Sequence, residues 1–184
     1  GVWTGDRMLV VRGECVVQPR SGRAAYRAGA AAGLYDPVAD AWTALPSPPA
    51  SWDGGDGFSL LWTGSKAIVY GGYRIEANPA PGTYPGIPRA TGATLDVATA
   101  TWTPFSIAPE QIGLTTSDRR DHQALWTGST MMVFGGVDAA RTCEAPRSAF
   151  VFNPFTLAGG LAPLRPTGQR AKFGKLFWNG ATAL

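Results

Sequence analysis

The stretch from His122 to Gly136 reads HQALWTGSTMMVFGG, and its construction recurs along the chain. An apolar run ends at Trp126, the corner Thr127-Gly128 follows, and a second apolar run from Met131 to Phe134 ends in the pair Gly135-Gly136. Two apolar runs joined by a Gly-containing corner are typical of a β-hairpin. The stretch therefore predicts two antiparallel strands with a glycine-marked exit.

The same hairpin occurs at two other places in the chain. Trp62-Thr63-Gly64 leads to Gly71-Gly72, and Trp3-Thr4-Gly5 leads to Arg12-Gly13, with an offset of nine from the Trp to the pair each time. A shortened copy begins at Trp178, so the four Trp residues are 59, 64 and 52 positions apart. A period of this length indicates a repeat architecture.

Each repeat is predicted to hold four strands. In the first unit, the strands after the opening one are Met8 to Val11, Ala30 to Tyr35 and Trp42 to Leu45. The strands of the second unit are Phe58 to Trp62, Ala67 to Tyr70, Ala93 to Leu95 and Trp102 to Phe105. The third unit adds Ala149 to Phe152 to its hairpin. The segment from Gly13 to Ala28 is expected to be irregular. Tyr35 and Leu95 each precede a Trp by seven positions, but Gly159 stands at that place in the third unit, so its fourth strand is the weakest.

We therefore expect an all-β chain, a β-propeller of four-stranded antiparallel blades with about three blades and part of a fourth. The blade units are 1–50, 51–108 and 109–165, and a further unit starts at 166–184. Because both ends fall inside a unit, we expect a segment of a larger propeller, whose remaining blades are partners of this one.

Composition narrows the class of protein. With 184 residues, 45% hydrophobic and 16% charged, the chain is typical of a folded protein. Its net charge is only +3 and it has no basic run, so no nucleic-acid partner is expected. No apolar run approaches the roughly 20 residues of a membrane span.

The residues resemble those of the kelch-repeat propellers. In that family a double Gly ends the second strand, an aromatic residue with Asp closes the third, and a Trp lies in the fourth; the matching residues here are Gly71-Gly72, Gly135-Gly136, Tyr35-Asp36, Trp42 and Trp102. Arg12, Leu95, Phe152 and Asn153 depart from the pattern. The Trp-Thr-Gly corners are most similar to those of the bacterial galactose-oxidase-like kelch proteins, which implies an exported protein, extracellular or periplasmic.

The resemblance also bears on chemistry. Galactose oxidase uses a copper site with two His and Tyr ligands, whereas His122 is the only His here, so we expect no catalytic residue, no metal and no cofactor. The function expected is protein or carbohydrate binding, or scaffolding. The alternative is a carbohydrate-acting enzyme of the galactose-oxidase-like or sugar-epimerase type, with its catalytic groups mostly in other blades.

Long connections are expected at one face of the blades, and binding residues usually lie on such loops. The candidates, all expected at this face, are Arg20, Arg23, Trp52, Arg74, Arg89, Arg119, Arg120, His122, Arg141 and Arg147. Two interpretations are open: charges that are merely solvated, or an Arg-lined surface for acidic ligands. For His122 the choice is between catalysis and a structural role at a strand end.

The Trp and Cys residues leave further alternatives. Trp52 either packs between blades or is an exposed ring that binds a sugar or a partner. Trp42, Trp62, Trp102 and Trp126 are expected in the core between blades, because their offsets are fixed. Cys15 and Cys143 either pair across two loops or remain separate thiols.

Overall fold

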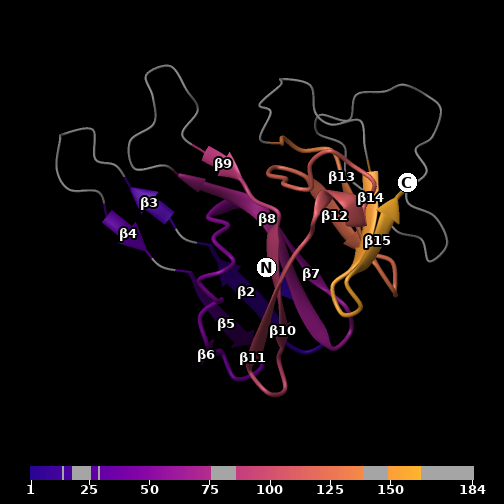
Figure 1. Cartoon of the computed structure of the whole chain (residues 1–184). Helices are drawn as coiled ribbons and strands as arrows, with labels where there is room; N and C mark the ends of the chain where they lie inside the picture. The colour runs from indigo at the N-terminus through magenta and orange to yellow at the C-terminus, as the bar shows by residue number, and fades with distance from the viewer. Residues whose placement is uncertain (14, 18–25, 29, 76–85, 139–148, 163–184) are drawn as a thin grey trace.

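The computed structural model describes residues 1–13, 15–17, 26–28, 30–75, 86–138 and 149–162. Apart from the short 3₁₀ turn η1 (Pro109–Gln111), its regular structure is all β-strand (Figure 1). The expectation of an all-β chain with four-stranded antiparallel sheets is confirmed. Nowhere in these ranges is there a helix with the length and apolar character needed to cross a membrane.

Three sheets follow one another along the chain, and each has four strands in one antiparallel path. Sheet 1 contains β1 (Val2–Trp3), β2 (Met8–Arg12), β5 (Ala31–Asp36) and β6 (Ala41–Leu45); sheet 2 contains β7 (Asp56–Trp62), β8 (Lys66–Ile75), β10 (Thr91–Asp96) and β11 (Thr101–Ser106); sheet 3 contains β12 (Gln123–Trp126), β13 (Met131–Phe134), β14 (Ala149–Asn153) and β15 (Ala158–Leu161). Within each sheet these four strands pair in chain order, as the repeat predicts.

The hairpin of the opening stretch is confirmed residue by residue. Gln123 pairs with Phe134 and Trp126 with Met131, and the Thr127 amide donates to the Thr130 carbonyl at 2.9 Å across the corner. Gly135 and Gly136 have φ of 66° and 84°, a region that side chains with a Cβ rarely adopt. The double glycine thus turns the chain out of the second strand.

The turn from third to fourth strand is also built alike in the three sheets. The side-chain oxygens of Asp36, Asp96 and Asn153 accept hydrogen bonds from the amides two and three residues later, at 2.8–3.2 Å. These bonds fix the turn locally, as short Asp and Asn side chains do. Asn therefore replaces Asp in the third unit without changing the turn.

Two segments contain strands that the sequence analysis did not predict. β3 (Cys15–Val17) pairs with β4 (Tyr26–Ala28) where an irregular segment was expected, and β8 continues to Ile75 to pair with β9 (Gly86–Pro88). The β-branched Val16 and Val17 favour extended backbone. The expectation gave the surrounding Gly and Pro residues too much weight.

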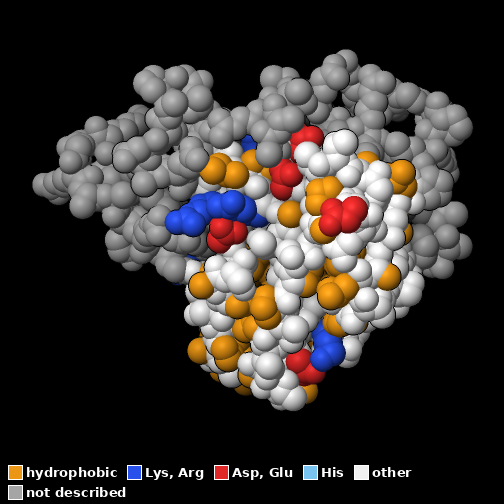
Figure 2. Space-filling view, in the orientation of Figure 1, with side chains coloured by type: hydrophobic (Ala, Val, Ile, Leu, Met, Phe, Trp, Pro, Cys, Tyr) orange, Lys and Arg blue, Asp and Glu red, His pale blue; other side chains and the backbone are white. Residues whose placement is uncertain are grey.

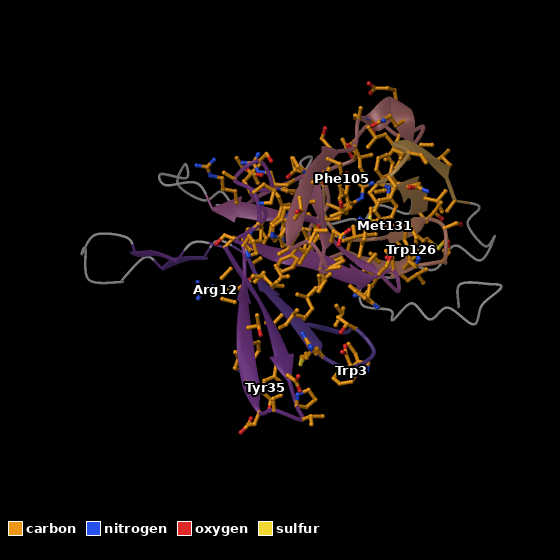
Figure 3. The ribbon with its side chains drawn as sticks, turned by 90° about the horizontal axis from the view of Figure 1, so that it is seen from below. Trp3, Arg12, Tyr35, Phe105, Trp126 and Met131 are labelled. Carbon is orange, nitrogen blue, oxygen red and sulfur yellow. The ribbon has the colours of Figure 1, made fainter. Side chains whose placement is uncertain are left out.

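Sheet 2 lies between the other two and contributes to both hydrophobic cores. One core joins sheets 1 and 2 and includes Leu9, Leu34, Val69 and Leu95. The other joins sheets 2 and 3 and includes Ile68, Tyr70, Phe105, Met131 and Phe152. In Figure 3, Phe105, Met131 and Trp126 lie together, away from Trp3 and Tyr35 at the far part of sheet 1.

The two connections between sheets complete these cores. Trp52, in the connection from sheet 1 to sheet 2, is 2% exposed, packs edge-on against Phe58 and donates to the Gly71 carbonyl at 3.3 Å. Ile107 and Ile112 are buried in the same way between sheets 2 and 3. These segments fill space between sheets, and of the two alternatives for Trp52 the structure supports packing between sheets over an exposed ring.

The expectation that four Trp residues lie in the core is met only in part. Trp62 and Trp102 pack against the first core and Trp126 against the second. Trp42, on the outer strand β6, is 62% exposed. It is wrong to place Trp42 in the core, because no described sheet covers the outward face of sheet 1.

The fourth strand of sheet 3 forms despite its glycines. β15 pairs with β14 over four residue pairs, from Asn153 with Ala158 to Phe150 with Leu161. Backbone pairing tolerates Gly159, whose absent side chain leaves room for Ile112. Tertiary packing therefore overrides low strand propensity here.

Because sheet 2 is buried on both faces, removing one of its core side chains should lower the free energy of unfolding. Ile68→Ala removes a fully buried side chain, so the free energy of unfolding should fall by about 2–5 kcal/mol. Val38→Ala, at an almost fully exposed turn position, should change it by no more than about 0.5 kcal/mol. Denaturant titration of both variants checks the contrast; equal losses would contradict the assignment of Ile68 to the core.

Candidate functional site

The described candidates gather where sheets 2 and 3 adjoin. Arg74, Arg89, Arg119, Arg120 and His122 all belong to the end of β8, to the β9 region or to the segment that enters β12. Trp52 is in the core and cannot present its ring to a ligand. Arg20, Arg23, Arg141 and Arg147 lie outside the described residues.

Backbone hydrogen bonds hold the segment before β12 in place. The Gly72 amide donates to the Arg119 carbonyl at 2.9 Å, and the Arg119 amide donates to the Arg89 carbonyl at 3.0 Å. Arg120 and Val137 exchange two such bonds. Residues from both sheets are therefore joined by main chain at this point, which gives the nearby side chains a rigid base.

Asp53 forms the centre of a group of charges. Its Oδ2 lies 2.9 Å from Nη2 of Arg89 and 3.9 Å from Nη1 of Arg74. The Thr91 hydroxyl donates to its Oδ1 at 3.4 Å. Basic and acidic side chains adjoin beside the β8–β9 end in Figure 2. One carboxylate thus orients two arginines, one in β8 and one directly after β9.

Tyr73, the residue before Arg74 in β8, contacts the segment before β12. Its hydroxyl donates to Oδ2 of Asp56 at 3.3 Å, and the Arg120 guanidinium lies 5.5 Å from the centre of its ring. Arg120 also pairs with the Asp121 carboxylate. We call Arg74, Arg89 and Arg120, with Asp53 and Tyr73, the arginine cluster.

Arg119 points inward and does not belong to this surface. Its Nη1 donates to the Asp118 carbonyl at 2.7 Å and to the Thr116 hydroxyl at 3.2 Å, and its guanidinium lies 5.8 Å from the Phe150 ring centre. Burial lowers the pKa of this guanidinium. With 2% exposure, Arg119 serves packing between sheets and is withdrawn from ligands.

His122 is buried beside Arg119 and packs edge-on against Tyr70, with ring centres 5.5 Å apart. No group within the described residues hydrogen-bonds to either of its ring nitrogens. Burial, with a smaller contribution from the Arg119 charge, lowers its pKa from 6.5 to about 3. A neutral, enclosed imidazole at the start of β12 favours the structural role over catalysis.

Tyr70 is buried beside His122 and also forms hydrogen bonds. Its hydroxyl donates to the Ser117 carbonyl, and the Ser117 hydroxyl donates to the Ile107 carbonyl. Burial raises the pKa of this phenol, so it stays neutral and donates. These bonds tie the second connection between sheets to β8.

Two further predictions concern metal and disulfide chemistry. In the part of the chain that the structure describes, no three His, Cys, Asp or Glu side chains are grouped to hold a metal ion. Cys143 lies outside that part, and the side chain of Cys15 is also not described. The pairing of the two cysteines therefore stays a prediction.

Neither a protein-family model nor any curated protein matches this sequence. The architecture of three successive sheets comes from the structure alone. The kelch resemblance remains a prediction from the repeated residues.

Sequence reasoning missed the acidic and aromatic partners of the arginines. Asp53, Asp56 and Tyr73 were not among the candidates, although they orient Arg74, Arg89 and Arg120. The available signal was Tyr73, an aromatic residue directly after the double glycine. The contact of its ring with Arg120 depends on backbone hydrogen bonds between residues far apart in sequence, such as Gly72 and Arg119, which no local pattern indicates.

Burial of His122 predicts a pH-dependent stability. Between pH 6.5 and about 3 the unfolded chain binds a proton on His122 that the folded chain excludes, so lowering the pH favours unfolding by about 1.4 kcal/mol per pH unit. Above pH 6.5 the imidazole is neutral in both the folded and the unfolded chain, so its burial costs no stability through protonation. The stability is lost progressively as the pH falls from 6.5 towards about 3.

The test compares wild type with His122→Phe in denaturant titrations from pH 7.5 to about 4. The variant retains the carboxylates, so the difference between the two proteins isolates the single His. The wild type should lose stability relative to the variant below pH 6.5. Parallel curves, or an imidazole NMR signal titrating near 6.5, would contradict burial of the neutral ring.

Proposed function

We propose that the chain is part of a kelch-type β-propeller and acts as a non-catalytic binding module. Its three sheets are successive blades, and its ligand is a protein or carbohydrate that binds at the face of the long connections. The arginine cluster is the centre of the binding surface.

The arrangement of first strands supports the propeller. β7 lies against both β1 and β12, so the opening strands of the three sheets are neighbours. Each sheet then packs its face on the next through one of the two cores. Opening strands together and sheets stacked in chain order are features of blades around a common axis.

The face assignment rests on where the connections emerge. β3, β4 and β9 lie at the upper end in Figure 1, whereas the turns joining β5 to β6 and β10 to β11 lie at the lower end. The arginine cluster belongs to the upper end, beside β9. A rigid sheet with longer connections at one end is a frequent arrangement for recognition.

The observation that supports binding best is that Asp53 brings Arg74 and Arg89 together, while Arg120 lies against Tyr73, the residue before Arg74. The Arg74 side chain is almost half exposed, and its Nη1 lies 3.9 Å from Oδ2 of Asp53, which is too long for a hydrogen bond. Its guanidinium can therefore donate to a second acidic partner. Arginine presents a planar fork that matches carboxylates. The cluster therefore favours an acidic ligand.

Binding is tested with acidic and neutral probes of both classes, namely polygalacturonate against dextran and polyglutamate against polyglutamine. We expect an acidic probe to bind and the neutral probes not to bind, with affinity falling as salt rises because exposed charges are screened. Arg74→Ser should weaken that binding by about tenfold or more.

Arg7→Ser is the matched control. The Arg7 side chain is 45% exposed against 46% for Arg74, and it also lies between two carboxylates, at 3.8 and 3.7 Å, but on the short corner of sheet 1. Its loss should leave binding unchanged. Equal effects of both variants, or equal binding of acidic and neutral probes, would refute the arginine cluster as the site.

A further inference from the structure

One face of sheet 1 is open where the matching faces of sheets 2 and 3 are covered. Strand register aligns one row of four residues across each sheet. These rows are Trp3, Met8, Tyr35 and Trp42 in sheet 1, Trp62, Ala67, Leu95 and Trp102 in sheet 2, and Trp126, Met131, Phe152 and Gly159 in sheet 3.

The rows of sheets 2 and 3 face the preceding sheet. Ala67 and Leu95 are fully buried in the core shared with sheet 1, and Met131 and Phe152 are fully buried in the core shared with sheet 2. In sheet 1 the same row is exposed instead: Trp3 by 54%, Met8 by 41% and Trp42 by 62%. The described part of the chain offers sheet 1 no preceding sheet.

Trp102 shows what a preceding sheet supplies. Its indole Nε1 donates to the Pro46 carbonyl at 2.8 Å, directly after β6 of sheet 1, while its ring packs against the core. Trp42 holds the same place in sheet 1, with its ring 5.1 Å from that of Tyr35. Large aromatic rings gathered on an exposed sheet face are typical of an interaction surface.

Sheet 3, the last of the three described sheets, has a complementary face that is partly exposed. The positions that face the following sheet pair Leu9 with Leu34 in sheet 1, Ile68 with Thr94 in sheet 2, and Met132 with Val151 in sheet 3. The first two pairs are buried, whereas Met132 and Val151 are partly exposed. Sheet 1 therefore exposes the face that packs on a preceding sheet, and sheet 3 partly exposes the face that packs on a following sheet.

We propose that the open row of sheet 1 docks the Met132–Val151 face of a second copy of this chain, head to tail. The contact repeats the packing that sheets 1 and 2, and sheets 2 and 3, already make within one copy. A head-to-tail contact closes into a ring when its rotation allows. The described residues of two copies bring twice three four-stranded sheets, within the four to eight blades that close a propeller.

The test is the solution mass of the whole chain by light scattering and sedimentation over a wide concentration range. We expect a species of about twice 19.3 kDa that dissociates on dilution. Trp42→Glu places a charge in the contact and should raise the concentration for half-dissociation by at least about tenfold. Val38→Glu, exposed on the neighbouring turn, should leave it unchanged.

Met132→Glu separates the head-to-tail arrangement from other pairings, because it alters only the second face. It should weaken the dimer as much as Trp42→Glu, and circular dichroism should show both variants folded. If Met132→Glu unfolds, Val151→Thr gives the same test with a smaller change. A monomer at every concentration, or a dimer insensitive to either face, would overturn the proposal.

Discussion

The structure depends on β8, a strand whose central residues are buried on both faces of the sheet. Ala67 and Val69 point into the core with sheet 1, Ile68 and Tyr70 into the core with sheet 3, and all four are fully buried. A strand buried on both faces cannot show the alternation of apolar and polar residues that marks a half-exposed strand. Because both cores include it, each outer sheet buries apolar residues against sheet 2.

The connections serve this layering as much as the strands do. Trp52 and Ile112 enter the gaps on either side of sheet 2, and Tyr70 and Ser117 satisfy polar groups that burial would otherwise leave unpaired. Segments that hold core residues are fixed, so the side chains they carry at the edge are fixed too. The arginine cluster owes its geometry to this support: Asp53 adjoins Trp52 in sequence, and Arg120 follows the buried Arg119.

Much of the fold followed from sequence because its signals are local. The Trp-to-glycine offset set the hairpins, and Asp36, Asp96 and Asn153 set the turns, through bonds between residues two or three apart. What failed depended on distant partners. Trp42 and Trp102 occupy the same place in the repeat, yet one is exposed, because burial depends on a neighbouring sheet and not on position. The site was only partly foreseen for the same reason: the arginines were named, but not the carboxylates that orient them.

Sheet 2 is covered on both faces and supports the other two. Native-state hydrogen exchange tests this layering, since amides in the most stable region open last. Amides of β8 and β10 should exchange more slowly than those of β2 and β5 in sheet 1 and of β13 and β14 in sheet 3. Slower exchange in either outer sheet, or equal exchange in all three, would contradict it.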